Sequence, residues 1–171
     1  MKRPAITICH ANARGTGTAL RLELHPARTD SDGSILATIA PQNAMEPVAS
    51  FDWNNSISVR LCLMDLAKIL QVFRGQYESI NDGKGFYHRT INGCTVVRLE
   101  HRIEPIGGYV LDVSHKPDYG EIVRLIFAMT YDEAFALAEA IDHAMLYVAF
   151  GVPFAERRIH TALKQTDRRQ K

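Results

Sequence analysis

The chain has 171 residues, of which 46% are hydrophobic and 23% charged. This is the composition of an ordinary globular protein and the length of one domain, which excludes wholesale disorder. No apolar run is long enough to cross a membrane, and no apolar segment follows the basic start, so we expect neither a membrane span nor a signal peptide.

The formal net charge of +1 conceals an uneven distribution. Residues 155–171 hold six Lys or Arg against two acids, a charge of +4, and residues 1–14 add three positives without an acid. The residues between them therefore carry −6. We divide the chain into a flexible basic arm, one α+β domain and a basic tail, at residues 1–17, 18–154 and 155–171.

The cysteines argue against a covalent or metal scaffold. Cys9, Cys62 and Cys94 are odd in number and show no CxxC spacing, which disfavours a disulfide framework and a zinc ribbon. We expect a cytoplasmic protein without cofactor or metal.

Three strands are expected before the first helix. In residues 19–24, leucines alternate with Arg21 and Glu23, the pattern of a half-buried strand. Residues 34–40 return after a turn, so the two strands form a hairpin. Residues 56–63 alternate in the same way, and a fourth strand is placed near residues 46–51.

The middle of the chain predicts a short helix and then a meander. Residues 64–74 change to helical spacing and end at Gly75. Four strands separated by turn sequences such as Asn92-Gly93 follow, typical of an antiparallel sheet. Their expected ranges are 86–91, 95–102, 108–114 and 121–128.

A long helix closes the domain. Thr130 and Glu133 form a capping box, and Gly151 followed by Pro153 ends the helix. Its second half is apolar nearly all round, which indicates burial on more than one side. We expect a subunit contact there, the alternative being burial within the monomer; the contact residues would be Met145, Leu146, Val148 and Phe150. The whole is an α+β fold of about seven or eight antiparallel strands, ordered strands, helix, strands, helix.

No catalytic motif is present. The chain lacks HExxH, GxSxG, a P-loop and GxGxxG, so we expect no enzyme activity. One catalytic alternative remains, a cleft around His88, His101 and Glu100, because the two histidines lie on neighbouring strands and could face each other.

Residues 82–89 combine a glycine-rich turn with cations and aromatic rings. Phe86 or Tyr87 could stack on an unpaired base while Lys84, His88 and Arg89 contact the backbone. The alternative is a plain hairpin in which Phe86 belongs to the core and Tyr87 to its rim.

The remaining candidates are scattered. Trp53, the only Trp, could stack on a base or close the end of the core. Arg60 and Arg98, with Arg157 and Arg158 of the tail, could hold phosphates.

A family resemblance rests on two stretches. Phe51-Asp52-Trp53, followed by strand 56–63 and helix 64–74, resembles the (Tyr/Phe)-Asp-Trp, strand and helix of the plant whirly proteins. A strand running into Thr130-Tyr131-Asp132-Glu133 and a long helix is similar to the second half of that family. The resemblance covers about residues 18–151 and extends to the single-stranded-DNA-binding transcriptional coactivators and the guide-RNA-binding proteins of trypanosome mitochondria.

The resemblance implies two four-stranded sheets, helices that pack subunits into a tetramer, and single-stranded nucleic acid lying across the sheets. We therefore expect a homo-oligomer, a dimer or tetramer, that binds single-stranded DNA or RNA with little sequence specificity, in transcription, replication or repair. The alternative, favoured by the acidic body, is a structural or protein-interaction oligomer that binds no nucleic acid.

Overall fold

The computed structural model describes residues 3–43, 48–105 and 107–152. They form two four-stranded antiparallel sheets and two α-helices in the predicted order, so the α+β class is confirmed. The elements are β1 (Ala5–His10), β2 (Thr18–His25), β3 (Ser34–Pro41), the 3-10 turn η1 (Trp53–Asn55), β4 (Ile57–Leu61), α1 (Leu63–Phe73), β5 (Phe86–Thr90), β6 (Gly93–Arg102), β7 (Gly108–Pro117), β8 (Val123–Thr130) and α2 (Tyr131–Phe150).

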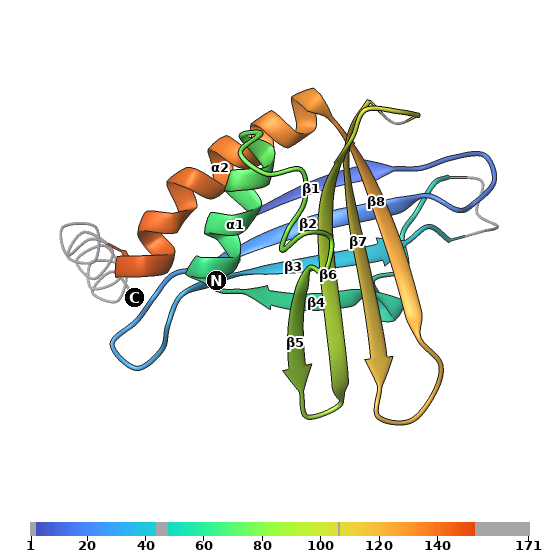
Figure 1. Ribbon diagram of the computed structural model, residues 1–171. Helices are drawn as coiled ribbons and strands as arrows, with labels where there is room; N and C mark the ends of the chain where they lie inside the picture. The colour runs from blue at the N-terminus through green and yellow to red at the C-terminus, as the bar shows by residue number, and fades with distance from the viewer. Residues whose placement is uncertain (1–2, 44–47, 106, 153–171) are drawn as a thin grey trace, which may run out of the picture.

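Each sheet is a meander in which every strand pairs with its neighbour in sequence. The first sheet has the order β1-β2-β3-β4 and the second β5-β6-β7-β8. The strands of the first sheet run across those of the second, and α1 and α2 lie side by side at one end of the pair (Figure 1). The two sheets therefore enclose the core with one face each and leave the other face outward.

The fourth strand of the first sheet differs from the prediction. It is β1, within the stretch expected to be a flexible arm, and it pairs with β2 in the register Ile6↔Leu22 and Ile8↔Leu20. Residues 48–51 of the range placed near 46–51 form no strand, since Phe51 makes only an isolated bridge with Gln42, and residues 46 and 47 lie outside the described residues. The physical reason is the alternation of Ile6 and Ile8 along the strand, which brings Ile8 against the core while Ile6 stays 43% exposed.

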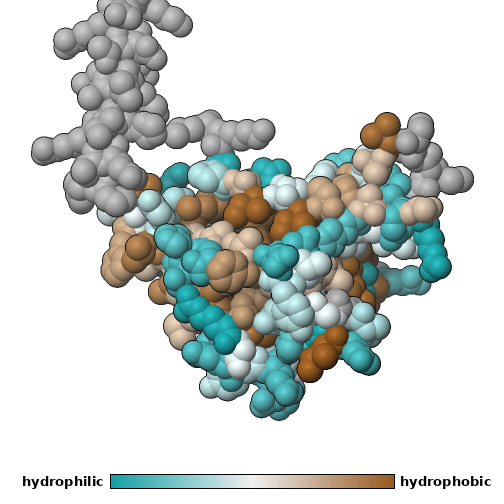
Figure 2. Space-filling model, turned by 90° about the horizontal axis from the view of Figure 1, so that it is seen from above, coloured by the Kyte–Doolittle hydropathy of each residue, from teal (hydrophilic) through white to brown (hydrophobic). Residues whose placement is uncertain are grey.

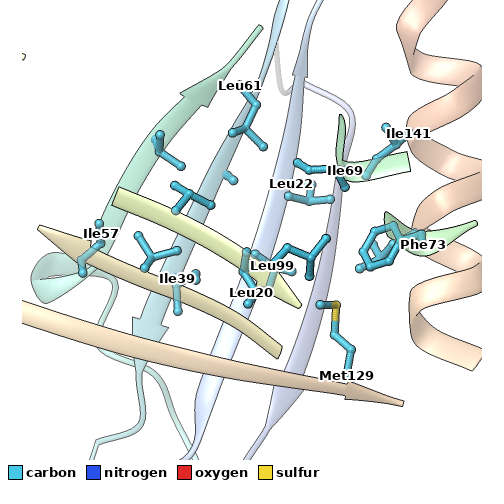
Figure 3. A pocket seen from close by; sticks show the side chains of 16 residues that line it. Leu20, Leu22, Ile39, Ile57, Leu61, Ile69, Phe73, Leu99, Met129 and Ile141 are labelled. Carbon is cyan, nitrogen blue, oxygen red and sulfur yellow. The ribbon is translucent and has the colours of Figure 1, made fainter. Parts of the chain in front are cut away.

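The core lies between the inner faces of the two sheets and the helices. Its members alternate along the strands, as the sequence predicted for β2 and β4. An apolar cavity of about 30 Å³ lies there. Figure 3 shows the side chains that line it, all apolar, among them Leu20, Ile39, Leu99 and Met129. A cavity without polar partners stays dry, so this space is a packing defect of the core and not a binding site.

The predicted capping box at the start of α2 is confirmed. Thr130 Oγ1 accepts a hydrogen bond from the Glu133 N–H at 3.3 Å, and Glu133 Oε2 accepts one from the Thr130 N–H at 2.9 Å. The Nε2 atom of His10, in β1, also lies 2.6 Å from Glu133 Oε1. Burial raises the pKa of Glu133, but the hydrogen bonds from Thr130 and His10 outweigh it, so the pKa lies below its ordinary value.

This lowered pKa predicts a pH-dependent effect of Glu133→Gln. The carboxylate stabilises the fold fully above its unfolded pKa, about 4.5, and the contribution is lost as the pH falls through the lower folded value. We expect Glu133→Gln to lower the free energy of unfolding by about 0.3–1 kcal/mol at pH 7, because a charge at a helix N-terminus has that worth. Urea unfolding at several pH values should show the difference from wild type shrinking below pH 4.5. A difference that stays constant down to pH 2 would contradict the assignment.

Helix α2 has two unlike faces. Ala134, Leu137 and Ile141 face the core and are buried. On the opposite side, Phe135, Leu146 and Phe150 are 69%, 64% and 80% exposed. With Tyr131 these residues define the outward stripe of α2, since their spacing places them on one side of a helix. Figure 2, which looks down on the helices, shows apolar residues gathered on the part of the surface that lies over them.

Two of the predicted subunit-contact residues are not on this stripe. Val148 is 3% exposed and belongs to the chain's own core, so its prediction as a contact residue is wrong. Met145 is half-buried and packs against the same core. Leu146 and Phe150 keep the exposed positions that a contact requires.

Candidate nucleic-acid interface

The outer face of the second sheet gathers most of the strand cations. Successive residues of a strand point to opposite faces of the sheet. The buried Val97 and Leu99, with their cross-strand partners, therefore belong to the inner face, and the residues directly before and after them in each strand belong to the outer face. The outer face carries one exposed aromatic ring and five cations against two carboxylates, Glu100 and Asp112, a net charge of +3. We name this surface the cationic face; its aromatic and cationic residues are Tyr87, Arg89, Arg98, Arg102, Lys116 and Arg124.

A carboxylate fixes two arginines at the centre of the cationic face. Asp112 is 8% exposed and accepts hydrogen bonds from Arg124 Nε and Nη2, both at 2.9 Å. Arg98 Nη1 lies 3.7 Å from the same carboxylate. The fork geometry holds the Arg124 guanidinium in place, while its side chain stays 60% exposed and can present further N–H groups to a phosphate.

Arg89 and Lys116 are the uncommitted cations. They flank Cys94 in one cross-strand row, Arg89↔Cys94↔Lys116, and both are exposed. Within the part of the chain that the structure describes, neither side chain makes an ion pair or a hydrogen bond. Their charge is therefore available to a ligand.

Tyr87 supplies the ring of this surface. It is 62% exposed and stands in the row Tyr87↔Val96↔Ser114↔Arg124. An exposed ring beside cations is the arrangement with which proteins stack unpaired bases and neutralise the phosphates between them.

Two predicted neighbours of Tyr87 point the other way. Phe86 is 5% exposed and belongs to the core, so its prediction as a stacking residue is wrong and the core alternative is right. His88 is also on the inner face, with Nε2 3.5 Å from Asp65 Oδ2. Lys84 is exposed in the turn that leads into β5, at the edge of the cationic face.

The other predicted residues belong to the first sheet or lie outside the described residues. Arg60, on the outer face of β4, donates from Nε to Ser34 Oγ at 2.7 Å and from Nη2 to the Asp32 carbonyl at 2.9 Å. Trp53 lies in η1 and is 38% exposed. The structure does not group these two with Tyr87, and Arg157 and Arg158 lie outside the described residues.

Sequence reasoning missed Lys116 and Arg124, and it did not name Arg102, although Arg102 lies within the strand predicted over 95–102. The strand predicted over 108–114 ended before Lys116, whereas β7 continues to Pro117. Arg124 was within a predicted strand, but its ion-pair partner was unknown. The register pairs Arg124 with Ser114 and Ile126 with Asp112, which places Arg124 diagonally beside Asp112. The alternation of β7 and β8, continued to their ends, was the signal that could have found both.

The three residues of the catalytic alternative lie apart in the structure. His88 stands opposite Thr95, six positions along β6 from His101, a separation of roughly 20 Å at the rise of a strand. His101 Nε2 lies 2.8 Å from the Tyr131 hydroxyl, and Glu100 is on the other face, paired with Arg102. The three side chains do not meet, so the prediction that the histidines could face each other is wrong. Among the described residues, no group of three His, Cys, Asp or Glu is placed to hold a metal ion.

A part of the domain's negative charge lies on α2, away from the cationic face. Helix α2 carries Asp132, Glu133, Glu139 and Asp142 and no Lys or Arg. Asp142 pairs with Arg74 at the end of α1 at 3.1 Å. Helix α2 and the cationic face thus carry net charges of opposite sign. Neither helix within the described ranges is long and apolar enough to span a membrane.

Comparison with solved structures identifies the fold. No protein-family model matches the chain, and no curated protein matches it by sequence. The chain superposes on WHY3 from Arabidopsis thaliana with a TM-score of 0.73, at 16% identity over 95% of this chain and 98% of that one. WHY1 from the same plant gives a TM-score of 0.69 at 18% identity, over 95% and 94% of the two chains. A guide-RNA-binding protein, in a complex bound to a guide RNA, gives 0.59 at 19% identity, over 85% and 92%. This chain therefore has the whirly-like fold.

Proposed function

We propose that this protein binds single-stranded DNA or RNA without catalysing a reaction, through the cationic face. The observation that carries the proposal is the grouping of Tyr87 with the unpaired Arg89 and Lys116 on one outward sheet surface. Phosphate neutralisation and ring stacking give affinity without reading base edges, so sequence specificity is low. The guide-RNA complex among the structural neighbours supports the same class of ligand.

The proposal includes a homo-oligomer, a dimer or tetramer, formed through the outward stripe of α2. Large apolar side chains exposed together on one helix side mark a protein contact. Repeating the cationic face in each subunit raises the effective concentration of binding sites along one strand. A role in transcription, replication or repair follows from this class of ligand. The free cysteines support a place in the reducing cytoplasm.

A second candidate is a protein-interaction oligomer without nucleic-acid binding. The observation that favours it is the acidic, partly apolar surface of α2, which has no Lys or Arg. The two candidate functions differ in the surface that binds the partner: the cationic face binds it in the first, and α2 binds it in the second.

Binding of oligo-dT at two salt concentrations tests the proposal. We expect fluorescence anisotropy to show binding at 50 mM salt that weakens steeply at 200 mM, because each neutralised phosphate contributes a slope of about −0.7 to log K against log salt for single strands. A mixed-sequence oligomer should bind within a few-fold. Absence of binding at low salt would leave the protein-interaction candidate, and deletion of residues 155–171 would show how much of the affinity belongs to the tail.

A further inference from the structure

A polar pocket lies at the edge of the second sheet, outside the cationic face. It has a volume of about 260 Å³ and is formed between one side of α1 and the segment that leads into β5. We name it the edge pocket; among the residues that line it are Lys68, Gln71, Val72, Tyr77, Asn81 and Asp82. Lys68, Gln71 and Val72 are spaced by three and four positions, which places them on one side of the helix.

The walls of the edge pocket are held in place by hydrogen bonds. Lys68 Nζ donates to Asn81 Oδ1 at 3.0 Å, and Asn81 Nδ2 donates to the Gly85 carbonyl at 2.8 Å. Asn81 and Asp82 both adopt positive φ, 50° and 54°, a conformation that few residues other than glycine accept. The pocket is thus preformed rather than a gap between mobile side chains.

The chemistry of the lining selects a neutral, planar group. Tyr77 is 58% exposed and offers a ring face, and the half-buried side-chain amide of Gln71 has no hydrogen-bond partner within the described residues. The Lys68 ammonium is already engaged by Asn81, and the Asp82 carboxylate repels an anion. A phosphate is therefore disfavoured, whereas a heterocycle with donors and acceptors on its edge satisfies both the ring and the amide.

The edge pocket continues the cationic face. Ser79 pairs with Glu100, so the segment before β5 prolongs the edge of the second sheet beside β6. The turn that closes the pocket passes through Lys84 directly into Phe86 and Tyr87 of β5. A strand whose phosphates lie on the cationic face can place one base over this edge.

We propose that the edge pocket is a subsite for one unpaired nucleobase of the bound strand. The inference rests on the proposed function and adds a site to it. The volume lies just below the roughly 300–1,000 Å³ of sites for drug-sized ligands, which suits a single base. The Tyr77 ring stacks on the base, and the Gln71 side-chain amide forms hydrogen bonds with the edge of the base.

The test compares Tyr77→Ala and Tyr77→Phe on two ligands, oligo-dT and an abasic oligonucleotide of the same length. Tyr77→Ala should weaken oligo-dT binding at least about fivefold, the lower end of the loss when a stacking ring is removed, and leave abasic binding unchanged. Tyr77→Phe keeps the ring and should bind within about twofold of wild type. Tyr119→Ala is the matched control, because Tyr119 is 95% exposed in the loop between β7 and β8.

The outcomes separate the two proposals. If wild type binds oligo-dT and Tyr77→Ala binds it equally well, the subsite is refuted and the function stands. An equal loss on the abasic ligand also refutes the subsite, because Tyr77 would then act on the backbone. If wild type binds neither ligand, the proposed function and the subsite fall together.

Discussion

The double variant Arg89→Ala/Lys116→Ala is expected to bind oligo-dT about 25-fold more weakly than wild type at 0.1 M salt. Each phosphate contact in a single strand contributes about 0.7 to the slope of log K against log salt, so two contacts contribute about 1.4. We assume that the two proteins bind equally at 1 M salt, where this contribution vanishes. Their affinities at 0.1 M salt then differ by ten to the power of about 1.4, which is about 25-fold. Anisotropy titrations between 0.05 and 0.5 M salt measure both the affinity and the slope.

These two cations allow a clean comparison. Both are exposed and unpaired within the described residues, so their removal leaves no buried partner, unlike removal of Arg124, which would strip Asp112 of its fork. Arg14→Ala/Arg28→Ala is the matched control: it removes the same charge from two exposed positions in the β1–β2 and β2–β3 loops, whose side chains make no ion pair within the described residues. An equal loss in both variants would mean that net charge alone governs binding and that the cationic face is no specific surface.

The elements could be predicted from the sequence where local chemistry decides them. Thr130 and Glu133 placed the start of α2, and Gly151, with a φ of 73°, placed its end, because capping depends on the residues at the terminus alone. β1 was missed because the basic residues around it resemble those of an arm. Only the pairing of Ile6 with Leu22 reveals the strand, and this pairing joins residues that no local pattern connects.

The faces of the second sheet could be predicted better than its register. Asn92-Gly93 correctly indicated a hairpin, yet the loop residues are Ile91 and Asn92, and Gly93 opens β6. A Cβ at Gly93 would lie 2.2 Å from the Lys116 carbonyl, so close approach of β7 requires glycine there. A two-residue loop of Asn92 and Gly93 would pair Tyr87 with Arg98. The observed loop pairs Tyr87 with Val96, two positions along β6, and therefore leaves its side chain on the same face.

The candidate site needed the structure because it is assembled across strands. Phe86 and Tyr87 are equal as aromatic residues in the sequence, and only the packing of Phe86 against the core separates them. Arg124 became part of the site through Asp112, twelve residues away in sequence. Sequence patterns describe such cross-strand groups only once the register is known.

The variant Leu146→Glu/Phe150→Glu is expected to convert the proposed oligomer into a monomer. The two side chains are 64% and 80% exposed on the outward stripe of α2, so a contact there buries them in full. Between copies, each new carboxylate would lose its hydration and meet the acidic residues that α2 already carries. Sedimentation velocity at micromolar concentration measures the state, with wild type expected to sediment as a dimer or tetramer.

The substitution should spare the fold of each subunit. Neither side chain belongs to the core, and a negative charge near a helix C-terminus costs about 0.3–1 kcal/mol per residue, small beside the 5–15 kcal/mol that stabilise a domain. Ile91→Glu/Ile122→Glu, at 94% and 63% exposed positions in the β5–β6 and β7–β8 turns, is the matched control and should leave the oligomer intact. A wild-type protein that sediments as a monomer would refute the assembly, and the gain from several cationic faces acting on one strand would be lost with it. A monomeric double variant that still binds oligo-dT, but more weakly and with a smaller salt slope, would show that each cationic face acts alone and that assembly adds to it.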